Sequence, residues 1–240
     1  MRRANVIVAE ILQELKQSIA PGVTTLELDT IAEELTLKKG AIPAFKGYSV
    51  AGRIFPRCLC ASINEEIVHG IPSHRALREG DIVGLDYGVI YDGFYGDSAI
   101  TVGVGRVSED AKRLMKVTEL ALHKGIEQLH EGKRLGDLGA VVQQTAESAG
   151  YSVVRAFVGH GIGKKLHEEP PVPNYGEPDR GVRLREGMVL AIEPMVNAGS
   201  YEVEIKDDGW TAVTKDGSLA AHFEHSVAVT KNGPFILSQL

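Results

Sequence analysis

Residues 77–86 of the chain read LREGDIVGLD, and residues 184–193 read LREGMVLAIE. Both copies begin with Leu-Arg-Glu-Gly and continue through an apolar run, typical of a buried strand, to one carboxylate, Asp86 in the first and Glu193 in the second. A repeated segment of this kind predicts two structurally similar halves. Because both copies end in a carboxylate, we expect a functional site between the halves, near the axis that relates them.

The repeat extends upstream into helices. Apolar residues at helical spacing predict one helix that ends before Pro21 and a second that ends near Gly40. The same spacing recurs over about residues 109–130 and 136–148, at the corresponding place before the second copy. Each half is therefore expected to begin with two helices.

Strand-like patterns follow the helices in both halves, over residues 58–104 and from Val153 to the C-terminus. No low-complexity linker or abrupt change of composition separates them. The sequence thus predicts an α+β protein in which one domain, 1–240, contains two halves, roughly 1–107 and 108–240, fused around a shared sheet.

Composition and charge exclude several classes of protein. The net charge is −6, from 26 basic and 32 acidic residues, and no block of like charge occurs, which argues against a nucleic-acid-binding or membrane-binding protein. Glu10 and Glu14 interrupt the first apolar segment, so it does not resemble a secretory leader. Cys58 and Cys60 are expected to be apolar core residues in a reducing compartment rather than a disulfide. We expect a soluble cytoplasmic protein.

An expected hairpin brings two carboxylates together. Asp-Gly at residues 92–93, between β-rich flanks, predicts a two-residue turn. That register pairs Asp86 with Ala99 and Gly88 with Asp97, so the two aspartates share a face with Cβ atoms roughly 7–8 Å apart or less. Such a pair can hold two divalent ions about 3.5–4 Å apart. Aspartates are usually solvated, but the apolar run before Asp86 favours burial, and a buried carboxylate needs a cation.

His160 stands between two glycines in residues 158–163, VGHGIG. The glycine spacing does not fit a dinucleotide-binding loop, and the prolines at 170–171 leave no room for the helix that such a loop requires. The flanking glycines have no side chains, so another group can come close to the backbone around His160. This suits a metal ligand or a substrate contact. A histidine in an ordinary turn is the alternative.

Two glutamates complete a set of candidate metal ligands. Glu193 ends the second repeat and Glu224 precedes a valine-rich strand; either could instead be a charge that protects a sheet edge. The whole set is Asp86, Asp97, His160, Glu193 and Glu224. The negative charges of four carboxylates balance the positive charges of two divalent ions. Oxygen ligands with one imidazole favour Mn, Fe, Co or Zn. A water shared by two such ions, deprotonated near neutral pH, would attack an acyl carbon, so the residues predict a dinuclear metallohydrolase.

The chain resembles the type I, bacterial-like methionine aminopeptidases of the pita-bread metallopeptidase family over essentially its whole length. Besides the Asp86/Asp97 pair, the matching motifs are SINE (62–65), HGIP (69–72), GHGIG (159–163), HEEP (167–170), IEPMVNAG (192–199), KDDGWT (206–211) and EH (224–225). The resemblance implies the pita-bread fold, in which two pseudo-twofold-related halves share an antiparallel sheet with helices on the outside. It also implies two metals and removal of an N-terminal methionine.

The resemblance also implies residue roles. Asp86 resembles the ligand that chelates one metal, Asp97 and Glu224 resemble bridges between both, and His160 and Glu193 resemble the ligands of the other. His69 and His167 match two histidines that contact the scissile amide and its developing oxyanion. The expected catalytic residues are thus His69, His167 and Glu193, and both histidines also bind substrate.

A pocket for the methionine side chain is implied by three further positions. Trp210, Cys60 and Tyr48 resemble pocket walls, although core packing would also account for Trp210. Phe45 is a weaker candidate, because residues 45–56 are longer than the usual loop of the family. Methionine is long, unbranched and polarizable, so aromatic and sulfur-containing walls suit it.

The expected substrate is a free N-terminal methionine followed by a small residue, at the N-terminus of a nascent polypeptide; association with the ribosome is left open. A proline-specific exopeptidase of the same fold is one alternative, although its glutamate motifs differ from those at 192–197 and 223–225. A non-catalytic binding protein of the same fold is another, although none of the five ligands is missing.

Overall fold

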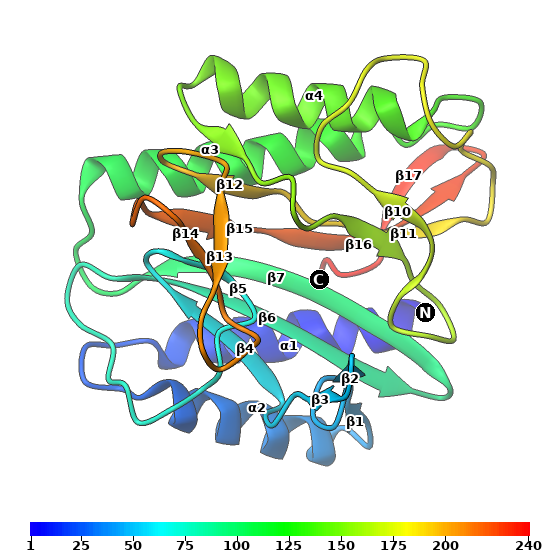
Figure 1. The fold of residues 1–240 in the computed structure, drawn as a ribbon. Helices are drawn as coiled ribbons and strands as arrows, with labels where there is room; N and C mark the ends of the chain where they lie inside the picture. Colours follow the sequence, from blue (N-terminus) through cyan, green and yellow to red (C-terminus); the bar gives the residue numbers. More distant parts are fainter.

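A single antiparallel sheet of nine strands runs through the whole molecule in the computed structural model, which describes residues 1–240 (Figure 1). Its strands, in spatial order, are β1 (Ile42–Pro43), β6 (Ile82–Tyr91), β7 (Phe94–Gly103), β16 (Glu224–Thr230), β11 (Val189–Ile192), β9 (Gly159–Gly161) and β10 (Glu168–Val172). Two more strands, β4 (Leu59–Ile63) and β17 (Gly233–Ile236), pair with β6 and β16. All of these pairings are antiparallel, as expected.

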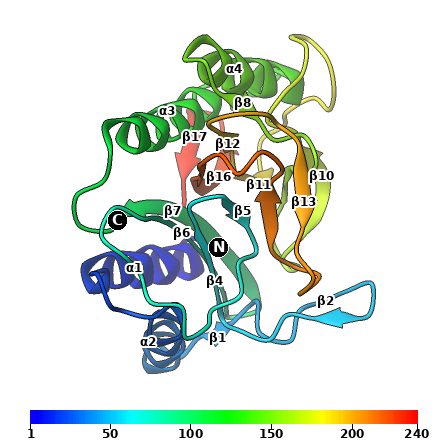
Figure 2. The ribbon, with the colours of Figure 1, turned by 60° about the vertical axis from the view of Figure 1, so that its left-hand side comes forward.

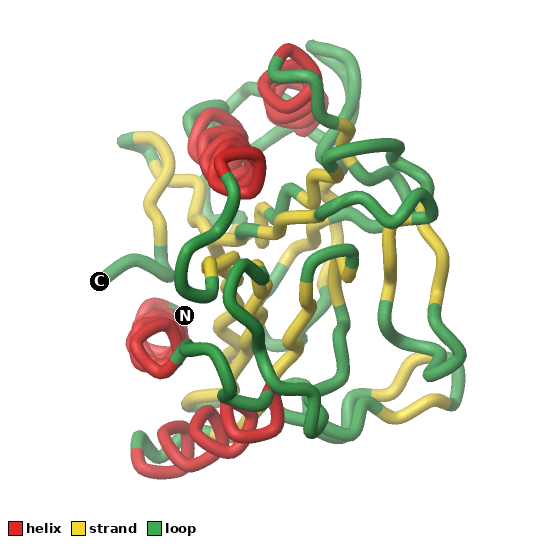
Figure 3. The backbone as a smooth tube through the Cα atoms, turned by 90° about the vertical axis from the view of Figure 1, so that its left-hand side faces the viewer, coloured by secondary structure: helices red, strands yellow, loops and turns green.

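Two pairs of helices cover the sheet, one pair for each half. They are α1 (Arg2–Ser18) with α2 (Thr25–Lys38), and α3 (Glu109–Ile126) with α4 (Leu135–Ser148). Figure 3 shows the pairs as separate groups beside the strands, with the other face of the sheet left to loops and short strands. The helix predicted over 109–130 ends earlier, at Ile126, and the chain then turns through Gly132 with φ +91°. No helix combines the length and the apolar character needed to cross a bilayer.

The repeated segments make the same contacts in each half. Leu77, the first residue of the first repeat, accepts a hydrogen bond from the backbone N–H of Gly22 and donates its own to Val23. Leu184, the first residue of the second repeat, exchanges the corresponding bonds with Gly132 and Lys133. The repeat is therefore also a repeat of three-dimensional structure, and residues 107 and 108 lie in the loop between β7 and α3.

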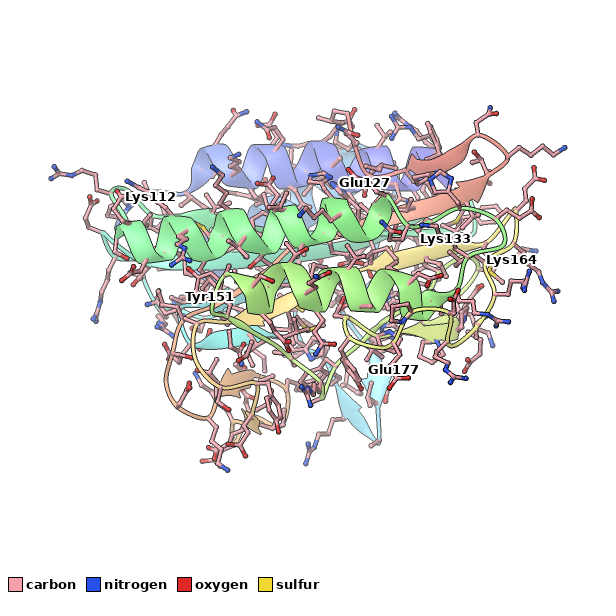
Figure 4. All side chains as sticks on the ribbon, turned by 90° about the horizontal axis from the view of Figure 1, so that it is seen from above. Lys112, Glu127, Lys133, Tyr151, Lys164 and Glu177 are labelled. Carbon is pink, nitrogen blue, oxygen red and sulfur yellow. The ribbon has the colours of Figure 1, made fainter.

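Each half packs its own apolar core between helices and sheet. In the first half, Ile7 and Ile11 of α1 are fully buried in a cluster that includes Leu85 of β6. In the second half, Leu138 of α4 packs in a cluster with Leu190 of β11. Charged side chains of both signs, such as Lys112 of α3 and Glu127 directly after it, are exposed on the outer side, as a solvent-facing helix requires (Figure 4).

The two halves of the sheet meet where β7 pairs with β16, which we call the β7–β16 junction. The ladder here contains two residue pairs, Glu224 with Ala99 and His225 with Ser98. Hydroxyl groups add to it, since Ser98 Oγ donates to the Glu224 carbonyl over 2.6 Å and Ser226 Oγ donates to the Asp97 carbonyl over 2.9 Å. The junction therefore depends on side-chain hydroxyls as much as on backbone pairing.

The remaining strands form three small sheets: β8 (Ser152–Val153), β12 (Met195–Asn197) and β15 (Ala220–His222); β5 (Glu66–Val68), β13 (Val203–Ile205) and β14 (Ala212–Thr214); and the hairpin β2 (Ser49–Val50) with β3 (Arg53–Ile54). The first of these sheets packs against α3 and α4, where Val196 and Ala221 share an apolar cluster with Leu114. In Figure 2 the helices lie on the left, while β13 and the β2–β3 hairpin lie on the right.

Cys58 and Cys60 are free and buried, as predicted. The Asp29 carboxylate of α2 accepts hydrogen bonds from the backbone N–H groups of Cys58, over 2.8 Å, and Leu59, over 2.9 Å. Asp29 is only 4% exposed, so this contact fixes the start of β4 against the helix.

We expect Asp29→Ala to lower the free energy of unfolding by about 2–4 kcal/mol, because two buried N–H groups lose their acceptor. Asp29→Asn keeps one oxygen that can accept both bonds, so its loss should be clearly smaller. Urea denaturation followed by circular dichroism measures both variants. Equal losses for the two would show that the hydrogen bonds do not fix β4.

Candidate metal centre

Three neighbouring strands bring three carboxylates to one place on the sheet. Asp86 of β6 and Glu224 of β16 both pair with Ala99 of β7, so they lie on either side of the same residue. Asp97, two residues before Ala99, points to the same face, and it pairs with Gly88 as the predicted hairpin register requires. The predicted register is confirmed.

The second half adds an imidazole and a fourth carboxylate. His160 of β9 pairs with Ala191 of β11, and Glu193 immediately follows that strand. The Nε2 atom of His160 lies 3.6 Å from Glu193 Oε1 and 3.9 Å from Asp97 Oδ2. One ligand atom each of Asp97, His160 and Glu224 lies within 4.8 Å of the other two. The two halves thus contribute to one cluster.

The cluster is buried and short of hydrogen-bond donors. Asp97 is 4% exposed and Glu224 is 2% exposed. Asp86 Oδ1, Asp97 Oδ1 and Glu224 Oε1 are all shielded from solvent without a hydrogen-bond partner. Unpartnered carboxylate oxygens in a protein interior are costly unless a cation or a proton satisfies them. These residues therefore fit divalent metal ions.

The protonation of the cluster follows from its burial. Burial raises the pKa of the Asp86 carboxyl to about 7. Burial first, and the neighbouring carboxylates second, hold the pKa values of Asp97, Glu193 and Glu224 well above their usual range. Cations that replace the protons would remove this penalty.

His160 is oriented as a ligand. Burial, together with the nearby His167, lowers the pKa of His160 to about 4, so its ring is neutral near pH 7. Its Nδ1 lies 2.9 Å from the carbonyl oxygen of Gly161, which can only accept, so Nδ1 carries the proton. The Nε2 lone pair then faces the oxygens of Asp97 and Glu193, an arrangement that a cation between them would make favourable.

The cluster lines one wall of a pocket. All ten residues that the sequence singled out line it: Tyr48, Cys60, His69, Asp86, Asp97, His160, His167, Glu193, Trp210 and Glu224. Phe45, the weaker candidate, lines it as well. That these residues bind metal or substrate stays a prediction.

The pocket has apolar walls that the sequence analysis did not identify. Val50, Phe55 and Leu166 also line it, and the rings of Phe55 and Trp210 meet edge to face with centroids 5.3 Å apart. Cys60, another lining residue, is only 5% exposed. Phe55 belongs to the long loop at 45–56, and no periodic pattern in this loop distinguished it as a pocket residue.

Two neutral histidines stand beside the cluster. Burial, with a smaller effect of His167, lowers the pKa of His69 to about 4, and burial lowers that of His167. His69 has φ +60°, and at Gly70 a Cβ would lie 2.3 Å from the Ala61 carbonyl oxygen. This backbone, held against β4, presents the His69 ring to the pocket.

A further buried histidine was missed. His222 of β15 is 3% exposed, and its Nε2, which has no hydrogen-bond partner, lies 3.8 Å from Glu193 Oε2. It does not line the pocket. Its position two residues before Glu224 was the only indication in the sequence, and β15 and β16 are separate strands, so that spacing is not informative.

Comparisons with known proteins agree with this geometry. Residues 1–231 match the sequence family described as metallopeptidase family M24. The methionine aminopeptidase of Clostridium perfringens is 53% identical over 238 residues, which cover 99% of this chain and 94% of that protein. The solved methionine aminopeptidase of Thermotoga maritima superposes with a TM-score of 0.97 at 47% identity, covering 100% of this chain and 95% of that one.

The prolidase of Pyrococcus furiosus gives a TM-score of 0.80 at 22% identity, with 100% of this chain and 63% of that one covered. This likeness concerns the fold alone. Together with the higher-identity structure, it confirms the predicted pita-bread fold.

The metal-free protein should show a pH-dependent penalty at Asp86. The raised folded pKa of about 7 compares with about 3.9 in an unfolded chain. Between these values the folded state binds more protons, so the contribution of this carboxyl to stability falls as the pH rises. We expect the stability gain of Asp86→Asn over the native chain, both treated with chelator, to grow by roughly 2–4 kcal/mol from pH 4 to 7.

Urea denaturation at several pH values measures this difference. The control is the same comparison with saturating Mn(II). If Asp86 is a metal ligand, the native chain should then be more stable than Asp86→Asn, because it binds the metal more tightly. A difference that stays constant from pH 4 to 7 would show that the Asp86 carboxyl is not buried in the folded, metal-free protein.

Proposed function

Because the chain belongs to metallopeptidase family M24, we propose that it is a metal-dependent aminopeptidase that removes the N-terminal methionine of nascent polypeptides when the second residue is small. One observation carries the proposal: four carboxylates and an imidazole, with unpartnered buried oxygens, form the floor of an apolar pocket. A metal held by these residues would bind the neutral amine at the chain end of a substrate, which favours an exopeptidase.

Two divalent ions are proposed to occupy the floor. Asp97 and Glu224 lie between the halves, which suits bridging carboxylates; Asp86 is on one side, and His160 with Glu193 is on the other. The set of one imidazole and four carboxylates accepts Mn, Fe, Co or Zn, and availability decides among them. Bound ions of this kind lower the pKa of water and polarise a carbonyl group.

The histidines are proposed to act on the scissile amide. His69 and His167 are neutral near pH 7 and stand at the edge of the carboxylate cluster, so a ring N–H of each can face the reacting group. A neutral ring nitrogen that carries a proton donates a hydrogen bond to an oxygen that becomes negative in the transition state. Glu193, whose pKa is raised by burial, lies at the same place and is proposed to hold or accept a proton there.

The apolar walls are proposed to bind the methionine side chain of the substrate. Phe55 and Trp210 form an edge-to-face pair, and the buried Cys60 also lines the pocket, so a long, unbranched and polarizable side chain fits. The second residue of the substrate would lie beside His69, whose ring packs edge-on against Phe157 with centroids 5.4 Å apart. We expect a bulky second residue to collide with the pocket walls near His69 and His167, which favours a small one.

Peptide hydrolysis tests the substrate. With saturating Mn(II) or Co(II), we expect kcat/KM for Met-Ala peptides to exceed that for Ala-Ala peptides by about 10²-fold, because a buried thioether side chain contributes 1.5–3 kcal/mol or so. Met-Leu peptides should be cleaved far more slowly than Met-Ala. Norleucine in place of methionine should be accepted within a fewfold, since an apolar pocket discriminates such isosteres weakly.

The same panel contains the outcomes that contradict the proposal. A clear preference for Ala-Pro peptides would assign the chain to the proline-specific exopeptidases. Equal rates on Met-Ala and Ala-Ala would mean that the pocket does not recognise methionine. No hydrolysis with either Mn(II) or Co(II) would favour a non-catalytic binding protein.

Removal of a bridging carboxylate tests the metal site. We expect Asp97→Ala to lose most bound metal together with at least 10²-fold in kcat, because both ions lose a ligand. Metal analysis of protein purified without chelator measures the occupancy, alongside the Met-Ala assay. Asp92→Ala, at the exposed turn of the same hairpin, is the matched control and should keep its metal. An Asp97→Ala protein with native metal content and turnover would refute the site.

A further inference from the structure

Tyr48 and His167 are joined by a hydrogen bond across the mouth of the pocket. The Tyr48 hydroxyl lies 2.5 Å from Nδ1 of His167, although 119 positions separate the two residues in sequence. Their rings meet edge to face, with centroids 5.3 Å apart. Both side chains line the pocket. The contact engages Nδ1 of His167, so Nε2 is the ring nitrogen that is left for the substrate.

Backbone hydrogen bonds fix the segment that carries Tyr48. The Tyr48 N–H donates to the Phe45 carbonyl over 2.9 Å, and the Phe55 N–H donates to the Tyr48 carbonyl over 2.8 Å. At the far end of the same loop, Arg53 Nη1 donates to the Gly209 carbonyl over 3.1 Å. The hairpin is thus fixed at both ends, so its tyrosine has a defined direction.

The hydrogen bond can run in either of two directions, with different consequences for His167. If the hydroxyl donates to Nδ1, the proton of the neutral ring is on Nε2; if Nδ1–H donates, Nε2 has a bare lone pair. A phenol O–H is the better donor and an imidazole nitrogen the better acceptor. Burial raises the pKa of Tyr48, so the phenol keeps its proton. The first arrangement is therefore favoured.

We propose that Tyr48 is a positioning residue: its hydroxyl donates to His167 Nδ1 and so keeps the His167 ring in the tautomer whose Nε2–H can donate to the oxyanion of the reacting amide. This inference rests on the proposed function, because it assigns Tyr48 a task in the same reaction. It adds to the role of Tyr48 as a pocket wall, which its ring alone could fill. The proton on Nε2 matters because a bare lone pair there would repel a developing negative charge.

Tyr48→Phe separates the two roles, since it keeps the ring and removes the hydroxyl. We expect kcat for Met-Ala to fall about 5- to 10-fold, the effect of one lost hydrogen bond, while KM and metal content stay within twofold of the native values. Tyr95→Phe is the matched control, because Tyr95 lies in the same apolar cluster and its hydroxyl makes no hydrogen bond to His167. It should leave both constants within twofold.

A double-mutant cycle checks that Tyr48 acts through His167. We expect His167→Ala alone to lower kcat by about 10²–10³-fold, and Tyr48→Phe to have no further effect in that background. A further fall of the same size in the double variant would show that Tyr48 acts independently. An unchanged kcat with a raised KM in Tyr48→Phe would leave the residue as a wall only. Either result overturns the proposal.

Nitrogen-15 NMR of the histidine rings in zinc-loaded protein gives a readout that does not depend on turnover. The His167 signals, assigned by their loss in His167→Ala, should show protonated Nε2 and unprotonated Nδ1, and Tyr48→Phe should shift them toward a mixture of tautomers. A proton on Nδ1 in the native protein would overturn the proposal. If the native protein fails to cleave Met-Ala, the proposed function fails, and the ring-nitrogen signals alone still decide which direction the Tyr48 hydrogen bond takes.

Discussion

The interior of this protein has to accommodate four carboxylates that repel one another. Their oxygens are buried without donors, and their pKa values are raised by burial and by one another, so the cluster is stable only with protons or cations in place. The pairing of β6, β7 and β16 holds three of these carboxylates close together. Two apolar cores, one in each half, pack the strands that carry these carboxylates. The geometry of the cluster is therefore set by strands that would form without it.

The sequence predicted the parts of the site that depend on local geometry. The Asp-Gly turn fixed the register of β6 and β7, so the relative position of Asp86 and Asp97 followed from strand pairing alone. The repeated LREG segments predicted the two halves, because the contacts of Leu77 and Leu184 with the preceding turns are local to each half. Family resemblance supplied the roles of His69 and His167, which no spacing in the sequence implied.

Contacts between distant segments could not be predicted in this way. The Tyr48–His167 hydrogen bond joins the hairpin of one half to a loop of the other, and the edge contact of Phe55 with Trp210 does the same. His222 approaches Glu193 from a small sheet whose position over the large one has no counterpart in the hydrophobic pattern. Such contacts depend on how the layers stack, whereas periodicity reports only which face of each element is apolar.

The β7–β16 junction has a mechanical consequence. Its two residue pairs and its hydroxyl contacts are few compared with the ten pairs that join β6 to β7. Asp97 and Glu224 lie on opposite strands of this junction, so an ion that binds both acts as a clasp between the halves. Binding of the ion would then be coupled to the cohesion of the sheet, in addition to the pairing of β5 with β14 that also joins the halves. Removal of such an ion would then also loosen the junction that holds its ligands together.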